Sequence, residues 1–169
     1  EHRADQHGRH QIDRMAMAGE PVAFIPYFVD PAGSRAYVPF SAVVARGITA
    51  DATGGLAQRT FGLKASAQGY PAWIANAAPQ DVRAKYGVAY EAEGSRSFTE
   101  AIRAGIDGGA SALHVMTWND YSEATEIQPS TATRFAYYDI AAYHIAWFKT
   151  GAPPIIERDV FVGLHRKQL

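Results

Sequence analysis

Apolar segments alternate with polar, glycine-containing turns along the chain, and each apolar segment has the length of a strand or a helix. Nearly unbroken apolar runs predict buried strands at residues 21–30, 41–48, 71–77 and 112–118, and a last short one at 160–164. Segments with an apolar helical face predict helices before residue 19, over 55–69, over 97–107, and from a start between 131 and 139 to residue 150. In the third helix, Ser97-Phe98-Thr99-Glu100 has the pattern of a capping box.

Strand and helix alternate about four times, which favours a parallel sheet with covering helices. Each unit has roughly 35–40 residues, near the ~30 of one unit in a (β/α)₈ barrel of ~250 residues. The expected fold class is therefore α/β of the (β/α)₈ TIM-barrel type. Residues 1–157 would form roughly its C-terminal half, and residues 158–169 an exit strand toward a following segment. A small open α/β sheet is the alternative.

The amino-acid composition indicates a globular domain and excludes several kinds of partner and site. The chain has 169 residues, of which 47% are hydrophobic and 20% are charged, as in a globular domain. The net charge of −1 gives no reason to expect nucleic acid or an anionic membrane as a partner. The absence of cysteine excludes disulfides and Cys-ligated metals. No apolar run approaches the ~20 residues of a membrane helix.

Candidate chemistry is concentrated where the strand at 112–118 ends. Asp120 and Glu123 follow it, and their spacing can place two carboxyl groups in one cleft, as glycoside hydrolysis requires. Trp118 and Tyr121 offer flat apolar faces to a sugar ring, and Asn119 offers a donor and an acceptor to hydroxyl groups. The competing interpretation is a pair of solvated loop acids.

The run Thr117-Trp118-Asn119-Asp120-Tyr121-Ser122-Glu123 resembles the Trp-Asn-Asp-Tyr-Gly/Ser-Glu motif of glycoside hydrolase family 71, the α-1,3-glucanases or mutanases. Three further segments resemble other parts of that family's barrel, namely residues 24–30, residues 137–151, and residues 154–159 with 165–166. Ser122 and Ala124 stand where family members tend to have Gly and Ser, which leaves the substrate open.

This resemblance implies a (β/α)₈ barrel that hydrolyses α-1,3-glucan, as polysaccharide or oligosaccharide, with inversion at the anomeric carbon. Asp120 and Glu123 match the family's catalytic acids, and Glu123 is the favoured general acid. The resemblance implies no metal and no organic cofactor, and a secreted or periplasmic enzyme. The family also carries an essential Asp in the N-terminal half of its barrel. This chain has no counterpart, so the missing half is an expected partner, and the resemblance leaves open whether the isolated chain is active or an inactive fragment.

Three further residues are candidates for substrate binding. Asp30 ends the first predicted strand and could line the cleft, although Asp before Pro-Ala-Gly is also ordinary turn chemistry. Glu91 could contact sugar, and a solvated or capping role is equally compatible with its position. Trp73 could face the cleft, but packing in the core is the stronger interpretation. Glu126 could be a third acid, with a surface role favoured.

Two other functions remain open. One is a related barrel glycosidase acting on another linkage, such as an endo-α-mannosidase-like enzyme with an Asn-Glu-Trp-x-Glu pattern at a strand end; Asp120 in place of Glu argues mildly against it. The other is a non-catalytic carbohydrate-binding module that keeps Trp118 and Tyr121 as platforms.

Overall fold

The computed structural model describes residues 48–49, 62–64, 67, 72–83, 85 and 87–163. The predicted first strand, with Asp30, and the predicted N-terminal helix lie outside these residues. Within them, the structure contains one parallel sheet, one antiparallel hairpin and two long helices.

The parallel sheet has the strand order β1-β2-β5, formed by Ile48–Thr49, Trp73–Ala77 and Ala112–Val115. Its register pairs Ile48 with Trp73 and Ile74 with Ala112. Parallel neighbours need a crossover, and helix α3 (Arg96–Asp107) lies in the one between β2 and β5. This β-α-β unit confirms the predicted α/β class and the strand, helix and strand expected at 71–77, 97–107 and 112–118.

Helix α3 lies against the sheet through small and apolar side chains. Phe98 and Ile102 are fully buried, and Ala101 is 1% exposed. Gly105 lets the helix come close, because a Cβ built there would lie 2.7 Å from both Ala75 Cβ and Leu113 Cδ2. The apolar residues that recur at helical spacing in the sequence therefore form the surface through which α3 contacts the sheet.

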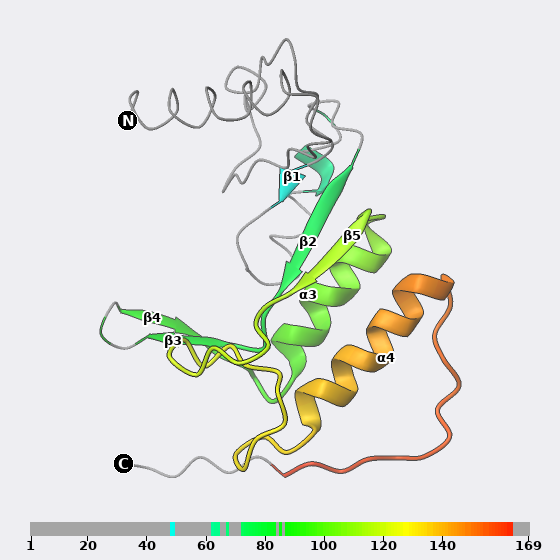
Figure 1. Cartoon of the computed structure of the whole chain (residues 1–169). Helices are drawn as coiled ribbons and strands as arrows, with labels where there is room; N and C mark the ends of the chain where they lie inside the picture. The colour runs from blue at the N-terminus through cyan, green and yellow to red at the C-terminus, as the bar shows by residue number, and fades with distance from the viewer. Residues whose placement is uncertain are drawn as a thin grey trace, which may run out of the picture.

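Helix α4 (Ala136–Thr150) packs beside α3 (Figure 1). The rings of Phe98 and Tyr137 meet edge to face with centroids 6.0 Å apart, and the Arg103 guanidinium lies 4.2 Å from the centroid of Trp147. The helix ends at Gly151, whose φ of 76° is the left-handed conformation that glycine adopts readily. The predicted end of this helix is confirmed.

A hairpin that the sequence pattern did not predict follows β2. Strands β3 (Asp81–Arg83) and β4 (Val88–Tyr90) pair in antiparallel register, with Val82 opposite Ala89. Figure 1 shows that this hairpin, the loop after β5 and the N-terminal ends of α3 and α4 all lie toward the carboxyl ends of β2 and β5. That end of the sheet therefore carries the candidate site.

Two local predictions were wrong. Ser97 does not close a capping box, because α3 begins at Arg96 and the Ser97 hydroxyl donates to the backbone oxygen of Glu91 at 2.7 Å. The exit strand expected within 158–169 is absent from residues 158–163, which are largely exposed and form no strand; residues 164–169 lie outside the described part.

Neither α3 nor α4, nor any other helix among the described residues, has the length and the apolar composition of a membrane span.

Candidate active site at the carboxyl end of the sheet

The loop after β5 is folded back on itself by hydrogen bonds between its two sides. The Thr117 amide donates to the Thr125 carbonyl, and the Ile127 amide donates to the Thr117 carbonyl, each at 2.9 Å. The hydroxyls of Thr117 and Thr125 also lie 2.8 Å apart. These bonds fix the base of the loop, so residues 118–124 form a defined tip rather than a loose chain.

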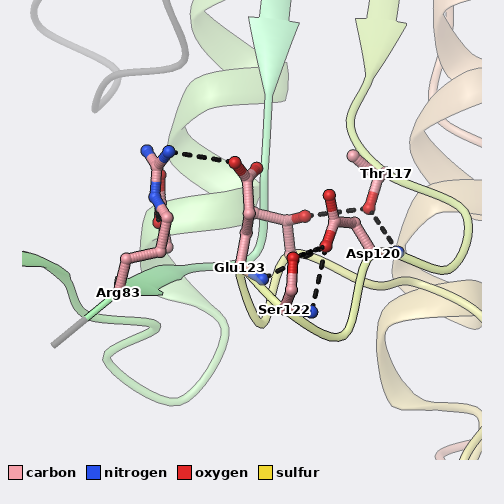
Figure 2. Close-up of polar contacts among 7 residues, drawn as sticks. Arg83, Thr117, Asp120, Ser122 and Glu123 are labelled. Carbon is pink, nitrogen blue, oxygen red and sulfur yellow. Dashed lines mark hydrogen bonds and ion pairs between the residues drawn. The ribbon is translucent and has the colours of Figure 1, made fainter. Parts of the chain in front are cut away.

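Asp120 is held in this tip by its own neighbours (Figure 2). Its Oδ1 accepts hydrogen bonds from the Ser122 amide at 2.9 Å, the Ser122 hydroxyl at 2.6 Å and the Glu123 amide at 3.2 Å. Its own amide donates to the Thr117 hydroxyl at 3.0 Å. The hydrogen bond from the Ser122 side chain, helped by the two amides, lowers the pKa of Asp120 below its ordinary value. Asp120 is therefore a carboxylate at neutral pH.

Glu123 faces the hairpin instead. Its Oε1 accepts a hydrogen bond from Arg83 Nη1 at 2.9 Å, and its backbone oxygen accepts from the Val82 amide at 2.9 Å. The same guanidinium also binds Asp81, with 2.8 Å between Nε and Oδ1. The side chains of Arg83 and Glu123 are about one-third exposed, at 34% and 33%. The hairpin thus orients Glu123 while leaving it open to solvent.

The remaining tip residues are open to solvent. Trp118 is 51% exposed and Tyr121 is 57% exposed, and Asn119 is also exposed. The Tyr121 hydroxyl donates to Gln128 Oε1 at 3.3 Å, which ties that ring to the far side of the loop. Trp118, Asn119, Asp120, Tyr121 and Glu123 therefore lie in one loop after β5, and their roles in catalysis and sugar binding stay predictions.

The other three candidates do not share this loop. Trp73 is 4% exposed, and a Cβ at Gly62 or Gly108 would contact its ring, so the side chain is enclosed in the core and offers no face to a sugar. This corrects its assignment to substrate binding. Glu91 is exposed directly after β4, and its carbonyl accepts the hydrogen bond from Ser97. Asp30 lies outside the described residues.

Two residues near the site were missed or misjudged. Arg83 was missed because its contact with Glu123 depends on the hairpin. The sequence gives little indication of this hairpin, since its two strands have three residues each and only Gly87 (φ 67°) marks its turn. Glu126, expected at the surface, is only 8% exposed, and among the described residues its Oε2 has no hydrogen-bond partner. Glu126 contributes to a raised pKa at Tyr137, although burial of the phenol is the larger cause.

The structure also shows a polar pair on the sheet. His114 Nδ1 and Asn76 Oδ1, on paired positions of β5 and β2, lie 3.1 Å apart. The His114 side chain is exposed, so it lies at the surface of the sheet. No group of three or more His, Asp or Glu side chains that could hold a metal ion occurs within the described residues.

Comparison with known proteins gives a structural likeness. No protein-family model and no curated protein matches the chain. A solved structure of the GH99 endo-alpha-mannosidase from Bacteroides thetaiotaomicron matches 76% of this chain and 44% of its own, with a TM-score of 0.62 and 15% identity. The same enzyme in complex with BIS-TRIS-propane matches 76% of this chain and 47% of its own, with a TM-score of 0.63 and 16% identity.

These matches show that the chain shares the fold of part of that enzyme. They support a partial (β/α)₈ barrel, although the described residues contain only a small portion of one. The chain spans less than half the length of both structures. At 15% and 16% identity the matches show a shared fold alone, and they do not point to glycoside hydrolase family 71.

Proposed function

We propose that the chain is part of a barrel glycoside hydrolase that cleaves an α-linked glycan with Asp120 and Glu123. One observation carries the proposal: two carboxyl groups, fixed by different partners, occupy one strand-end loop at the end of the sheet where α/β enzymes bind their substrates. The fold shared with part of an endo-alpha-mannosidase supports the same reaction class.

The two acids differ in environment, which is how paired carboxyl groups acquire separate roles. Asp120 has a lowered pKa and so remains ionised, which suits the residue that accepts a proton from water. Glu123 is then the group that protonates the leaving glycosidic oxygen. In an inverting reaction, the proton lost from Glu123 is balanced by the proton that Asp120 takes from the attacking water. The ion pair with Arg83 holds the Glu123 side chain on the hairpin side of the loop.

Two substrates are consistent with this site. The motif around Asp120 favours α-1,3-glucan, whereas the structural likeness favours an α-mannoside. The exposed rings of Trp118 and Tyr121 suit a pyranose of either kind, because a sugar's C–H groups pack on an aromatic face.

The test is reducing-sugar release from α-1,3-glucan and from α-linked mannooligosaccharides, with Glu123→Gln beside the parent. We expect release from one of the two substrates and a loss of about 10³-fold in the variant, the scale on which general acids act. Ser111→Ala, which changes an exposed residue just before β5, serves as the control and should match the parent. Release that survives in Glu123→Gln would contradict the assignment.

A non-catalytic carbohydrate-binding module is the second candidate. It is favoured by the exposed rings of Trp118 and Tyr121, which can hold a sugar without any turnover. Glycan binding without any turnover, unchanged in Glu123→Gln, would support this function over hydrolysis.

A further inference from the structure

Three aromatic side chains cluster at the acid-bearing loop, and two of them, Phe135 and Tyr138, have no role in the function proposed above. Trp118 comes from the loop, whereas Phe135 and Tyr138 come from the start of α4. The ring centroids of Trp118 and Tyr138 are 6.4 Å apart, and those of Phe135 and Tyr138 are 6.3 Å apart. The cluster therefore joins two segments separated in sequence, at the end of the sheet that carries Asp120.

The three rings remain open to solvent despite touching one another. They are 51%, 58% and 43% exposed at Trp118, Phe135 and Tyr138. Their planes meet at 71° and 79°, so each contact is edge to face. An edge-to-face contact covers at most one face of a ring, which leaves flat surface available. Contiguous aromatic surface of this kind is uncommon on a folded protein unless something binds there.

Polar groups lie around the cluster. Asn119 is exposed directly after Trp118, and the half-buried Asp139 directly follows Tyr138. Asp139 also lines a cavity of about 410 Å³ between the N-terminal ends of α3 and α4 and the segment after α4. Aromatic faces bordered by hydrogen-bonding side chains match a sugar, which presents C–H groups on its face and hydroxyls around its rim. An apolar protein partner would leave Asn119 and Asp139 without partners.

We infer that Trp118, Phe135 and Tyr138 form a distal subsite that binds a pyranose unit of the glycan away from the bond being cleaved. The inference rests on the proposed function, because it places this subsite beside the acids of the same loop. It adds Phe135 and Tyr138 as determinants of the length of glycan that binds. A glycan long enough to reach the cluster gains contacts that a disaccharide lacks.

Binding is measured with α-1,3-linked glucooligosaccharides and α-linked mannooligosaccharides of two to six units. Trp118 is the one of the three tryptophans that is more than half exposed, since Trp73 is buried and Trp147 is half-buried. Iodide quenching should thus report chiefly on Trp118, and a bound hexasaccharide should protect it. We expect Tyr138→Ala and Phe135→Ala each to raise the Kd for the hexasaccharide about tenfold and to leave the disaccharide unchanged.

Tyr138→Phe, which keeps the ring, and Ile155→Ala, which removes an exposed apolar side chain elsewhere, serve as controls that should bind as the parent does. Equal losses for short and long glycans, unchanged binding in both alanine variants, or no protection of Trp118 by any oligosaccharide would overturn the subsite. Ring-dependent binding without sugar release would keep the subsite and reject the proposed hydrolysis. Sugar release that is unchanged in Tyr138→Ala and Phe135→Ala would reject the subsite and keep the proposed hydrolysis.

Discussion

Ser122 lowers the pKa of Asp120 more than any other neighbour does. Its hydroxyl and amide both donate to Asp120 Oδ1, and the hydroxyl is the largest cause of the lowered pKa. The Ser122→Ala substitution removes the hydroxyl and keeps the amide. The pKa of Asp120 should then rise toward its ordinary value.

The consequence for activity follows from the proposed role of Asp120 as the base, which must be ionised. A higher pKa means that Asp120 becomes protonated at a higher pH, so the acidic limb of the profile of kcat/KM moves upward in Ser122→Ala. Carboxyl titration by ¹³C NMR checks the same shift without turnover. Ser111→Ala should leave both curves in place, and an unmoved acidic limb in Ser122→Ala would show that Asp120 is not the base.

The residues of this site differ in how far the sequence predicts them. The acids and aromatic residues of loop 118–123 are predicted, because they are consecutive and follow an apolar strand. Arg83 reaches Glu123 across 40 positions through a hairpin, and no local pattern contains that contact. Glu126 is buried by tertiary packing, whereas its sequence neighbourhood looks polar. Single residues whose role depends on distant partners are therefore the ones that sequence alone misses.

Helix α3 provides a prediction at the scale of an element, at Gly105. An Ala there would gain helix propensity of up to about 1 kcal/mol. Its Cβ would also lie 2.7 Å from Ala75 Cβ, which is fixed by the backbone of β2, so helix and sheet would have to separate. We expect the steric cost to exceed the gain and Gly105→Ala to lower the free energy of unfolding by about 1–2 kcal/mol.

Chemical denaturation monitored by circular dichroism measures this effect. Gly163→Ala is the matched control, because a Cβ there meets nothing within 4 Å, and it should be nearly neutral. A Gly105→Ala protein as stable as the parent would mean that α3 and the sheet can move apart without loss.

Long elements with a clear period are predicted well, and short ones are not. Helices α3 and α4 have apolar faces and end at glycine, so their existence and their ends are predictable. Strands β3 and β4 have only three residues each, too few to show a period, so they are missed. The capping box fails because α3 begins at Arg96, so Ser97 lies within the helix, where its hydroxyl donates to the Glu91 carbonyl.

At the scale of the whole molecule, the alternation of strands and helices predicts the parallel sheet, and the structural likeness at 15% identity agrees with it. The sequence motif resembles that of glycoside hydrolase family 71, whereas the solved structures that share the fold are of a GH99 endo-alpha-mannosidase. This divergence is understandable, because a barrel sets where the acids lie, whereas loop residues set the substrate. Substrate assays with both glycans are therefore more informative than further fold comparison.

The segment after α4 exposes large apolar side chains that the helices and sheet do not cover. Ile155 is 90% exposed, Ile156 is 66% exposed and Phe161 is fully exposed at 103%. Exposed apolar residues in an extended segment favour association between molecules. Replacing all three by Ser should therefore increase the monomer fraction at high concentration. The Tm should stay within about 2 °C of the parent, because few native contacts are lost.

Light scattering coupled to size-exclusion chromatography, together with thermal unfolding, tests this prediction over a range of concentrations. The matched control replaces Thr150 by Ser, which keeps the hydroxyl that donates to the Ala146 carbonyl at 2.9 Å and leaves the apolar segment intact. That variant should associate as the parent does. A clear fall in Tm for the triple variant would instead show that this segment packs against the body of the protein, and its apolar side chains would then belong to the core.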